Sequence, residues 1–443
     1  MTNFGIKAIE VYFPKRYVCQ EDLEKHDDCV GKYTIGLGQS KMSVTTSCED
    51  VASIALTVLQ NLFERMRISP KDVGFLEVGS ETLIDKSKST KTVLMSLFEE
   101  SKNFDVAGTD SRNACFSGTA ALLNALNWLH SPYWDGRLAV AVASDIAVYE
   151  SKVTRPTGGV GAVAILLGPD APIQFESKML AHTMKHVYDF YKPQLASEYP
   201  QVNGQMTMDC FKDALISCFE TLAKKSSGEP LAVSSFDYCC FHSPFVKLIM
   251  KGFYWLNLKF GTNEKIQQVE NDISLDAKSK ERISIEALKN EFQRQVEPSL
   301  LFARNCGNMY SAALYANLVS LLLNLSAGEH EDKEKRVLMF SYGSGYASAM
   351  FSLTVPTNKS LIEQIIGKRE DILQKLENER IAISVQQFLQ CLLDRETNHN
   401  QISFKPLVEN QFLYPGQYFL QSVDAKYRRT YSRFIPFHAN GSH

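Results

Sequence analysis

Several features of secreted, metal-binding and membrane proteins are missing from this sequence of 443 residues. The ten cysteines include no C-x-x-C pair, and no group of Cys and His has the spacing of a zinc site. No apolar run reaches the roughly 20 residues of a membrane helix, and the first residues resemble neither a secretory signal nor an arginine-rich transit segment. We therefore expect a soluble cytoplasmic protein with reduced thiols, no metal and no membrane insertion.

An excess of charge of one sign is also missing. The chain has 47 Lys and Arg against 50 Asp and Glu, a formal net charge of −3, with the two signs interspersed. This balance gives no reason to expect nucleic acid or an anionic membrane as a partner. The length allows two domains or two fused halves, each with its own core.

What the sequence does contain is an unusual setting for one cysteine, in the stretch TDSRNACFSGTAALLNALNWLH. An extended run precedes Cys115, and an apolar helical pattern follows from about Gly118 to His130. A cysteine at a helix start is near unpaired N–H groups, which favour a thiolate, and its small neighbours leave room for a second molecule. The alternative, a small buried cysteine, is the more common situation for a lone Cys.

Two halves of the chain repeat the same order of elements without recognisable identity. A strand ends at Glu81 in the first half and at His242 in the second. A helix rich in small residues then begins at Cys115 and just after Asn308, and an apolar strand follows each helix. If the halves pack about a pseudo-twofold axis, these four residues converge at its centre. The alternation of strands and helices predicts largely parallel α/β layers.

Three further segments carry predictions of their own. Residues 336–355 (RVLMFSYGSGYASAMFSLTV) have the pattern of an apolar strand, with a turn at SYGSG. Residues 263–298 are highly charged at helical spacing, which is typical of a solvated helical insertion without chemistry. Residues 186–205 are aromatic, contain proline and resemble a loop.

Along nearly the whole chain lie the motifs LEVGSETLIDKSKSTKT, NACFSGTAALLNALNWL, ASDIAVY…RPTGGVGAVA, YDFYKP…SEYP, FHSPFVKL, NCGNMYS, FSYGSG and KYRRTY. They resemble those of the eukaryotic hydroxymethylglutaryl-CoA (HMG-CoA) synthases, which belong to the thiolase-like superfamily. The resemblance extends to about Tyr431. It implies a five-layered αβαβα fold of two related halves, 1–172 and 173–443, and a homodimer. It also implies synthesis of HMG-CoA from acetyl-CoA and acetoacetyl-CoA for the mevalonate pathway of isoprenoid and sterol formation.

The same resemblance assigns roles to individual residues. It makes Cys115 the nucleophile, Glu81 the general acid/base and His242 the residue that binds acetoacetyl-CoA. Asn308 and Ser344 match positions that contact the acyl groups. Five more residues match positions around the CoA: Lys32, Thr157, Thr207, Lys247 and Lys251. No metal or prosthetic group is implied, because coenzyme A arrives as the acyl carrier of the substrates.

The sequence departs from the family pattern at a few positions. The usual ACYGGT reads ACFSGT, so Phe116 lacks a phenolic hydroxyl and Ser117 replaces a glycine. Val153 stands where an Asn is common, Cys29-Val30 replace the usual residues before Gly31, and the terminal HANGSH has no recognised counterpart.

Two rival functions remain open from the sequence. An initiating ketoacyl synthase also uses Cys, His and Asn, but it has no equivalent of Glu81. A catalytically silent relative that binds CoA esters or a partner protein fits the departures at Phe116, Ser117 and Val153. Retention of all three chemical residues, Cys115, Glu81 and His242, argues against it.

Overall fold

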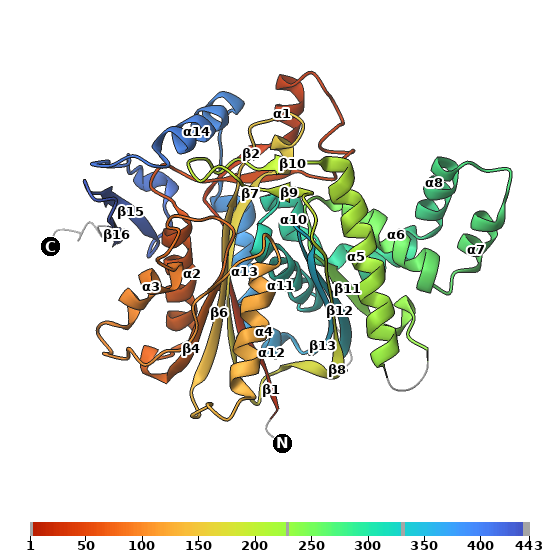
Figure 1. Cartoon of the computed structure of the whole chain (residues 1–443), viewed down its shortest axis with the longest axis horizontal. Helices are drawn as coiled ribbons and strands as arrows, with labels where there is room; N and C mark the ends of the chain where they lie inside the picture. Colours follow the sequence, from red (N-terminus) through yellow and green to blue (C-terminus); the bar gives the residue numbers. More distant parts are fainter. Residues whose placement is uncertain (1–2, 227–229, 329–332, 437–443) are drawn as a thin grey trace.

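The structure is a computed structural model that describes residues 3–226, 230–328 and 333–436. The HANGSH tail lies outside these residues. Nine strands form the main sheet: β1 (Phe4–Tyr12), β4 (Val73–Gly79), β5 (Asp110–Ser111), β6 (Leu138–Ala147), β7 (Gly159–Pro169), β8 (Ile173–Met184), β11 (Tyr238–Phe241), β12 (Lys335–Gly343) and β13 (Ala347–Val355). Their order across the sheet is β11-β12-β13-β8-β1-β7-β6-β4-β5 (Figure 1).

The order of strands contains the predicted repeat. In the first half β4 pairs with β6, β6 with β7, and β7 with β1. In the second half β11 pairs with β12, β12 with β13, and β13 with β8. Each series begins with a parallel pair and continues with two antiparallel pairs, and the two series meet where β1 pairs with β8. Glu81 and His242 thus follow equivalent strands, β4 and β11.

The expectation of a largely parallel sheet was wrong. Among the described strands of this sheet, the pairs β11–β12, β4–β6 and β4–β5 are parallel and the other neighbours are antiparallel. The reason is that a parallel pair needs a long crossover connection, usually a helix. No α-helix separates β6 from β7, and a short turn joins β12 to β13.

Residues 336–355 accordingly form a hairpin of two strands. β12 and β13 pair along their whole length, from Lys335 opposite Val355 to Gly343 opposite Ala347. At the turn, Gly345 and Tyr346 have φ values of 75° and 70°, in the left-handed region that a tight reversal requires.

The α-helices are α1 (Gln20–His26), α2 (Val51–Met66), α3 (Thr90–Leu94), α4 (Ser117–Leu129), α5 (Gly204–Lys225), α6 (Val246–Phe260), α7 (Glu264–Asn271), α8 (Ala277–Ala287), α9 (Lys289–Gln295), α10 (Leu301–Cys306), α11 (Ala313–Leu325), α12 (Lys359–Ile366), α13 (Arg369–Gln374) and α14 (Val385–Asn398). Segment 263–298 is helical as predicted, and α7 and α8 project from the body in Figure 1. Smaller sheets pair β9 (Phe190–Tyr191) with β10 (Gln201–Val202), β2 (Arg16–Cys19) with β3 (Lys41–Val44) and β14 (Ile381–Ala382), and β15 (Tyr418–Val423) with β16 (Arg429–Arg433).

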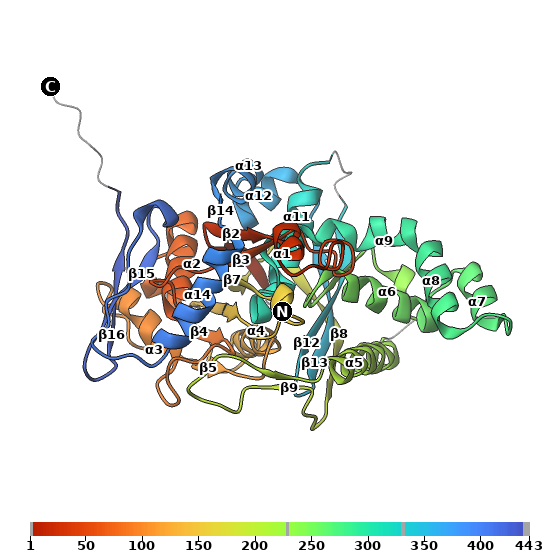
Figure 2. The same cartoon turned by 90° about the horizontal axis from the view of Figure 1, so that it is seen from above.

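Five layers result from the packing of helices on this sheet, as Figures 1 and 2 show from two directions. The apolar helices α4 and α11 lie in the middle, where they pack with residues from both halves of the sheet in the largest core. Helix α2 covers the outer face of the first half, and helices α5 and α6 cover that of the second. The predicted αβαβα fold is confirmed. Within the described part of the chain, no helix could span a membrane, and no three His, Cys, Asp or Glu side chains form a metal-binding group.

Candidate functional site

Cys115 lies in a tight turn two residues before helix α4. Ala114 has a φ of 45°, which is costly for a residue with a Cβ, by about 1–3 kcal/mol. The amides of Phe116 and Ser117 donate to the carbonyls of Asn113 and Ala114, at 3.1 Å each. Those two amides are therefore engaged within the turn, and the Cys115 side chain is held at the mouth of the helix.

Two strands end against this turn without room for a side chain. A Cβ on Gly79, at the end of β4, would lie 2.3 Å from the Ser117 carbonyl oxygen. A Cβ on Gly343, at the end of β12, would lie 2.4 Å from the Asn113 carbonyl oxygen. Glycine at both positions lets the two halves of the sheet approach Cys115 closely.

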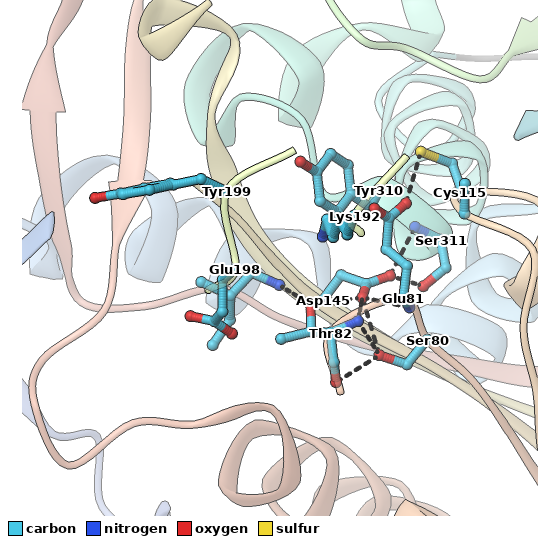
Figure 3. Close-up of polar contacts among 12 residues, drawn as sticks. Ser80, Glu81, Thr82, Cys115, Asp145, Lys192, Glu198, Tyr199, Tyr310 and Ser311 are labelled. Carbon is cyan, nitrogen blue, oxygen red and sulfur yellow. Dashed lines mark hydrogen bonds and ion pairs between the residues drawn. The ribbon is translucent and has the colours of Figure 1, made fainter. Parts of the chain in front are cut away.

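Glu81 contacts the cysteine from the loop that follows β4 (Figure 3). The Cys115 Sγ–H donates to Glu81 Oε2 over 3.3 Å. Burial raises the pKa of Glu81, with Asp145 acting in the same direction and the ammonium of Lys192 opposing it. The carboxylate is thus a base in hydrogen-bond contact with the thiol.

Cys115 itself is not an activated thiolate in this state of the protein. Burial raises the pKa of its thiol well above the ordinary value, and the adjacent Glu81 carboxylate raises it further. These two effects outweigh the helix-start position from which the sequence suggested a thiolate. The thiol must therefore lose its proton to a base when it reacts, and Glu81 is in contact with it.

Asp145 fixes the backbone around Glu81. It is fully buried in β6, and its Oδ1 accepts from the Glu81 amide (2.9 Å), the Ser80 hydroxyl (2.9 Å) and the Thr82 hydroxyl (2.8 Å). Its Oδ2 accepts from the Ser311 amide at 3.1 Å and from the Ser311 hydroxyl. Since Ser311 belongs to the second half, this carboxylate ties the Glu81 loop to both halves of the fold.

His242 and Asn308 belong to the second half of the repeat. The His242 amide, just after β11, donates to the Phe340 carbonyl at 2.7 Å, and burial lowers the pKa of the imidazole to about 3, so the ring is neutral at physiological pH. Asn308 is buried, and its Oδ1 accepts from the Tyr310 amide at 2.9 Å. No hydrogen bond between described residues joins His242 to Glu81 or Cys115 directly.

Ser344 is brought to the cysteine turn by the β12–β13 hairpin. Its carbonyl accepts from Asn113 Nδ2 at 3.2 Å, two residues before Cys115. The next amide, of Gly345, donates to Asp189 Oδ1 at 2.7 Å, which fixes the hairpin turn.

The chain matches two family models over almost its whole length. Residues 1–172 match hydroxymethylglutaryl-coenzyme A synthase N terminal, and residues 173–434 match hydroxymethylglutaryl-coenzyme A synthase C terminal. The chain belongs to the hydroxymethylglutaryl-CoA synthase family. This family membership confirms the resemblance read from the motifs and decides against an initiating ketoacyl synthase.

Comparisons with individual proteins agree with this family assignment. Hydroxymethylglutaryl-CoA synthase of Mycosarcoma maydis is 44% identical, with 99% of each chain covered. The cytoplasmic enzyme of Homo sapiens is 41% identical, with 97% of this chain and 87% of that protein covered. A solved structure, MvaS in complex with 3-hydroxy-3-methylglutaryl coenzyme A, superposes with a TM-score of 0.82 at 27% identity, covering 98% and 99% of the two chains.

Three of the five residues predicted to surround the CoA, Lys32, Lys247 and Thr157, lie on segments that contact one another. The loop that carries the exposed Lys32 is anchored by Glu24, whose carboxylate accepts from the Gly31 amide at 2.9 Å and from the Thr34 hydroxyl at 3.0 Å. The amide of Lys247 donates to the Leu37 carbonyl of the same loop at 3.0 Å.

Thr157 lies in a short helix, Arg155–Thr157, that contacts the segment around the Lys32 loop. The neighbouring Pro156 carbonyl accepts from Gln20 Nε2 at 2.8 Å, and Arg155 forms an ion pair of 2.7 Å with Asp27 at the start of the Lys32 loop. The other two positions are engaged elsewhere. The Thr207 hydroxyl donates to the Asp189 carbonyl at 3.1 Å, and Lys251 Nζ lies 2.9 Å from Glu281 Oε1 in α8.

Sequence reasoning missed three polar residues around Glu81. Asp145 had a usable signal, since it is the one charged residue inside an otherwise apolar strand, LAVAVASDIA. Lys192 and Ser311 had none that was specific. Lys192 stands in a segment whose sequence predicts a loop, and Ser311 in the small-residue helix expected after Asn308.

We expect the neutral state of His242 to be visible in the pH dependence of turnover. Because burial holds the pKa of the imidazole near 3, well below the ordinary 6.5, the ring stays uncharged at every pH above about 4. The ratio of turnover between wild type and His242→Ala should therefore be constant from about pH 5.5 to 8 at saturating substrate. A ratio that falls toward unity below pH 6.5 would mean that His242 becomes protonated in that range.

Proposed function

We propose that this chain condenses acetyl-CoA with acetoacetyl-CoA and water to give HMG-CoA and free CoA, through an acetyl group carried on Cys115. The observation that carries the proposal is the Cys115–Glu81 contact, a thiol and a carboxylate 3.3 Å apart at the centre of a pseudo-twofold HMG-CoA synthase fold. The proposal extends to the fusion of two halves, 1–172 with Glu81 and Cys115, and 173–443 with His242, Asn308 and Ser344.

Acetylation of Cys115 is the first step. Glu81 accepts the thiol proton as the sulfur attacks the acetyl carbonyl of acetyl-CoA, and the CoA thiolate leaves and takes up a proton. A thioester replaces a thioester, so little bond energy changes. Acetyl-CoA therefore serves as its own activated donor, and no cofactor beyond the CoA of the substrates is required by the proposal.

Condensation follows on the same sulfur. Glu81, by then ionised again, removes a proton from the acetyl methyl group, and the resulting carbon nucleophile attacks the ketone of acetoacetyl-CoA. The neutral imidazole of His242 can donate a hydrogen bond to that ketone, and the proton held by Glu81 is available to the new alkoxide. Asn308 and Ser344 border the acyl groups. Water then hydrolyses the thioester to Cys115 and releases HMG-CoA.

The substitutions next to the nucleophile are compatible with this chemistry. The Ser117 hydroxyl donates to the Ala114 carbonyl at 2.8 Å, and the Phe116 ring packs against Ala347 and Ala349. Both side chains are therefore accommodated within the turn and its core. This supports an active enzyme over the silent CoA-ester-binding relative.

The proposal includes a setting in the cell and an assembly. The relatives named cytoplasmic, such as that of Homo sapiens, support a cytoplasmic enzyme of the mevalonate pathway. A homodimer is proposed from the family resemblance.

The direct test is incubation of the purified protein with acetyl-CoA and acetoacetyl-CoA, with mass spectrometry of both the products and the protein. We expect HMG-CoA to accumulate, and Cys115 to carry an added acetyl group when acetyl-CoA is given alone. If neither substrate is consumed over hours, the proposal is refuted.

The two lysines of α6 should differ in their effect on CoA binding. Lys247 has no ion-pair partner among the described residues, whereas Lys251 pairs with Glu281. An exposed ion pair contributes about 0.2–1 kcal/mol, so Lys247→Ala should raise KM for the CoA substrates by a few-fold, and less at high salt. Lys251→Ala should have a smaller effect, and Glu281→Gln should lower KM by freeing Lys251. Equal effects of the two lysine variants would contradict this difference.

A further inference from the structure

The Glu81 carboxylate lies between the nucleophile and a buried cation that no role has been assigned to. Its Oε2 accepts from Cys115, and its Oε1 forms an ion pair with Lys192 Nζ at 3.0 Å. The side chains of Lys192 and Glu81 are only 19% and 5% exposed. Figure 3 shows the three groups in a row, in the order Lys192, Glu81, Cys115.

Aromatic rings hold the ammonium of Lys192 in place. Its Nζ lies 4.9 Å from the centre of the Tyr310 ring and 5.9 Å from that of Phe190. A cation over the face of an aromatic ring is attracted by the electron density of that face. Lys192 directly follows β9, so the β9–β10 segment delivers one charge into the centre of the fold.

We propose that Lys192 is a positioning residue, whose ammonium keeps the Glu81 carboxylate ionised and turned toward the Cys115 sulfur. The inference rests on the proposed function of Glu81 as the base. One carboxylate oxygen is taken by Lys192, so the other is left to face the thiol and, after acetylation, the acetyl group on that sulfur.

The surroundings of Glu81 show why a cation is needed there. The titratable groups that face it are Asp145 from β6, Cys115, Tyr149, Tyr310 and Lys192. Burial and Asp145 both raise the pKa of Glu81, and Lys192 lowers it. Lys192 stays charged although burial alone would lower its pKa, because the carboxylates of Glu81 and Asp145 raise it above the ordinary value.

Loss of this cation has a definite consequence. A buried carboxyl beside Asp145, without a counter-ion, binds a proton at higher pH. In that form Glu81 can donate a hydrogen bond but cannot accept the proton of Cys115 or of the acetyl methyl group. The base would then be available only at a pH above the new, higher pKa of Glu81.

The test compares the wild type with Lys192→Met, in full-length protein, by measuring the rate of HMG-CoA formation against pH. An opposite charge at this distance shifts a carboxyl pKa by roughly 1–3 units, so we expect the acid limb of the profile to move to higher pH by about that amount. Lys192→Arg keeps the positive charge, so its acid limb should lie close to that of the wild type. The matched control is Lys185→Met, because Lys185 lies on the same connection between β8 and α5 as Lys192. This variant removes a more exposed lysine that pairs with Asp213 of α5, and it should leave the acid limb in place. An unmoved limb in Lys192→Met, or an equal movement in Lys185→Met, would overturn the proposal.

A second readout does not depend on the substrates. Infrared difference spectra of Lys192→Met against Lys192→Met/Glu81→Gln should show a protonated carboxyl band that titrates at a higher pH than in the corresponding wild-type pair. If Lys192→Met fails to fold, Lys192→Gln provides the same loss of charge with a polar side chain. Absence of HMG-CoA formation in the wild type would refute the proposed function, whereas an unshifted infrared titration would refute the role of Lys192.

Discussion

Replacement of Cys115 by alanine is expected to abolish both acetylation and condensation. The sulfur is the atom to which the acetyl group is transferred, so its removal leaves no covalent route. We expect loss of HMG-CoA formation on the order of 10⁶-fold, the size found when the nucleophile of a covalent enzyme is removed. The measurement is peptide mapping after incubation with isotope-labelled acetyl-CoA, together with the rate of HMG-CoA formation.

The other cysteines provide the controls for this experiment. Cys239 and Cys240 are fully buried in β11, and burial raises the pKa of the Cys240 thiol to about 12, so neither should take up label. Cys19→Ala changes a partly exposed cysteine at the end of β2, which has no described hydrogen bond with Cys115 or Glu81, and should retain activity. Label that persists in Cys115→Ala, on any of these cysteines, would assign the acetyl group to a different residue.

The fold could be predicted from the sequence to the extent that its elements are local. The strand before Glu81, the helix after Cys115 and the strand before His242 each have a complete periodic pattern within a dozen residues. Their repeated order predicted the two related halves, and the strand order around β1 and β8 confirms that arrangement.

The direction of the strands could not be predicted in the same way. An apolar run looks the same whether its neighbour is parallel or antiparallel, because periodicity reports burial on both faces and not the partner. The hairpin within 336–355 illustrates this, since Gly343 and Ala347 are opposite one another although the residues on both sides form one apolar pattern.

The candidate site, too, could be predicted from the sequence only in part. Cys115, Glu81 and His242 carry motifs in the sequence, and the resemblance placed them, although their roles remain proposals. Lys192 and Ser311 are 119 residues apart and reach Glu81 and Asp145 only through the packing of the two halves. No local pattern contains such a long-range contact, so the cation beside Glu81 became apparent only in the structure.

Replacement of Glu81 by glutamine should separate the two chemical steps. Condensation requires the acetyl methyl group to lose a proton, and an amide cannot accept it, so HMG-CoA formation should fall by roughly 10²–10⁴-fold or more. Acetylation loses the base that accepts the thiol proton in the wild type, so it should be slower, but it should persist for an electrostatic reason. The Glu81 carboxylate raises the pKa of the Cys115 thiol, whereas Lys192 lowers it, so the variant loses the first effect and keeps the second.

The sign of this change makes the experiment decisive. In Glu81→Gln the pKa of Cys115 should fall. The acetyl-enzyme should therefore form at a substantial rate, and its formation should extend to a lower pH than that at which the wild-type thiol would ionise by itself. Rapid-quench measurement of labelled acetyl-Cys115, with HMG-CoA measured in the same samples, reports both steps. Exchange of the acetyl methyl hydrogens with solvent, where the wild-type intermediate has it, should disappear. Glu81→Asp is the control, because it keeps the charge and shortens the reach, and should recover part of the condensation. Near-normal condensation in Glu81→Gln would exclude Glu81 as the base, and complete failure to acetylate would make proton removal from Cys115 its main task.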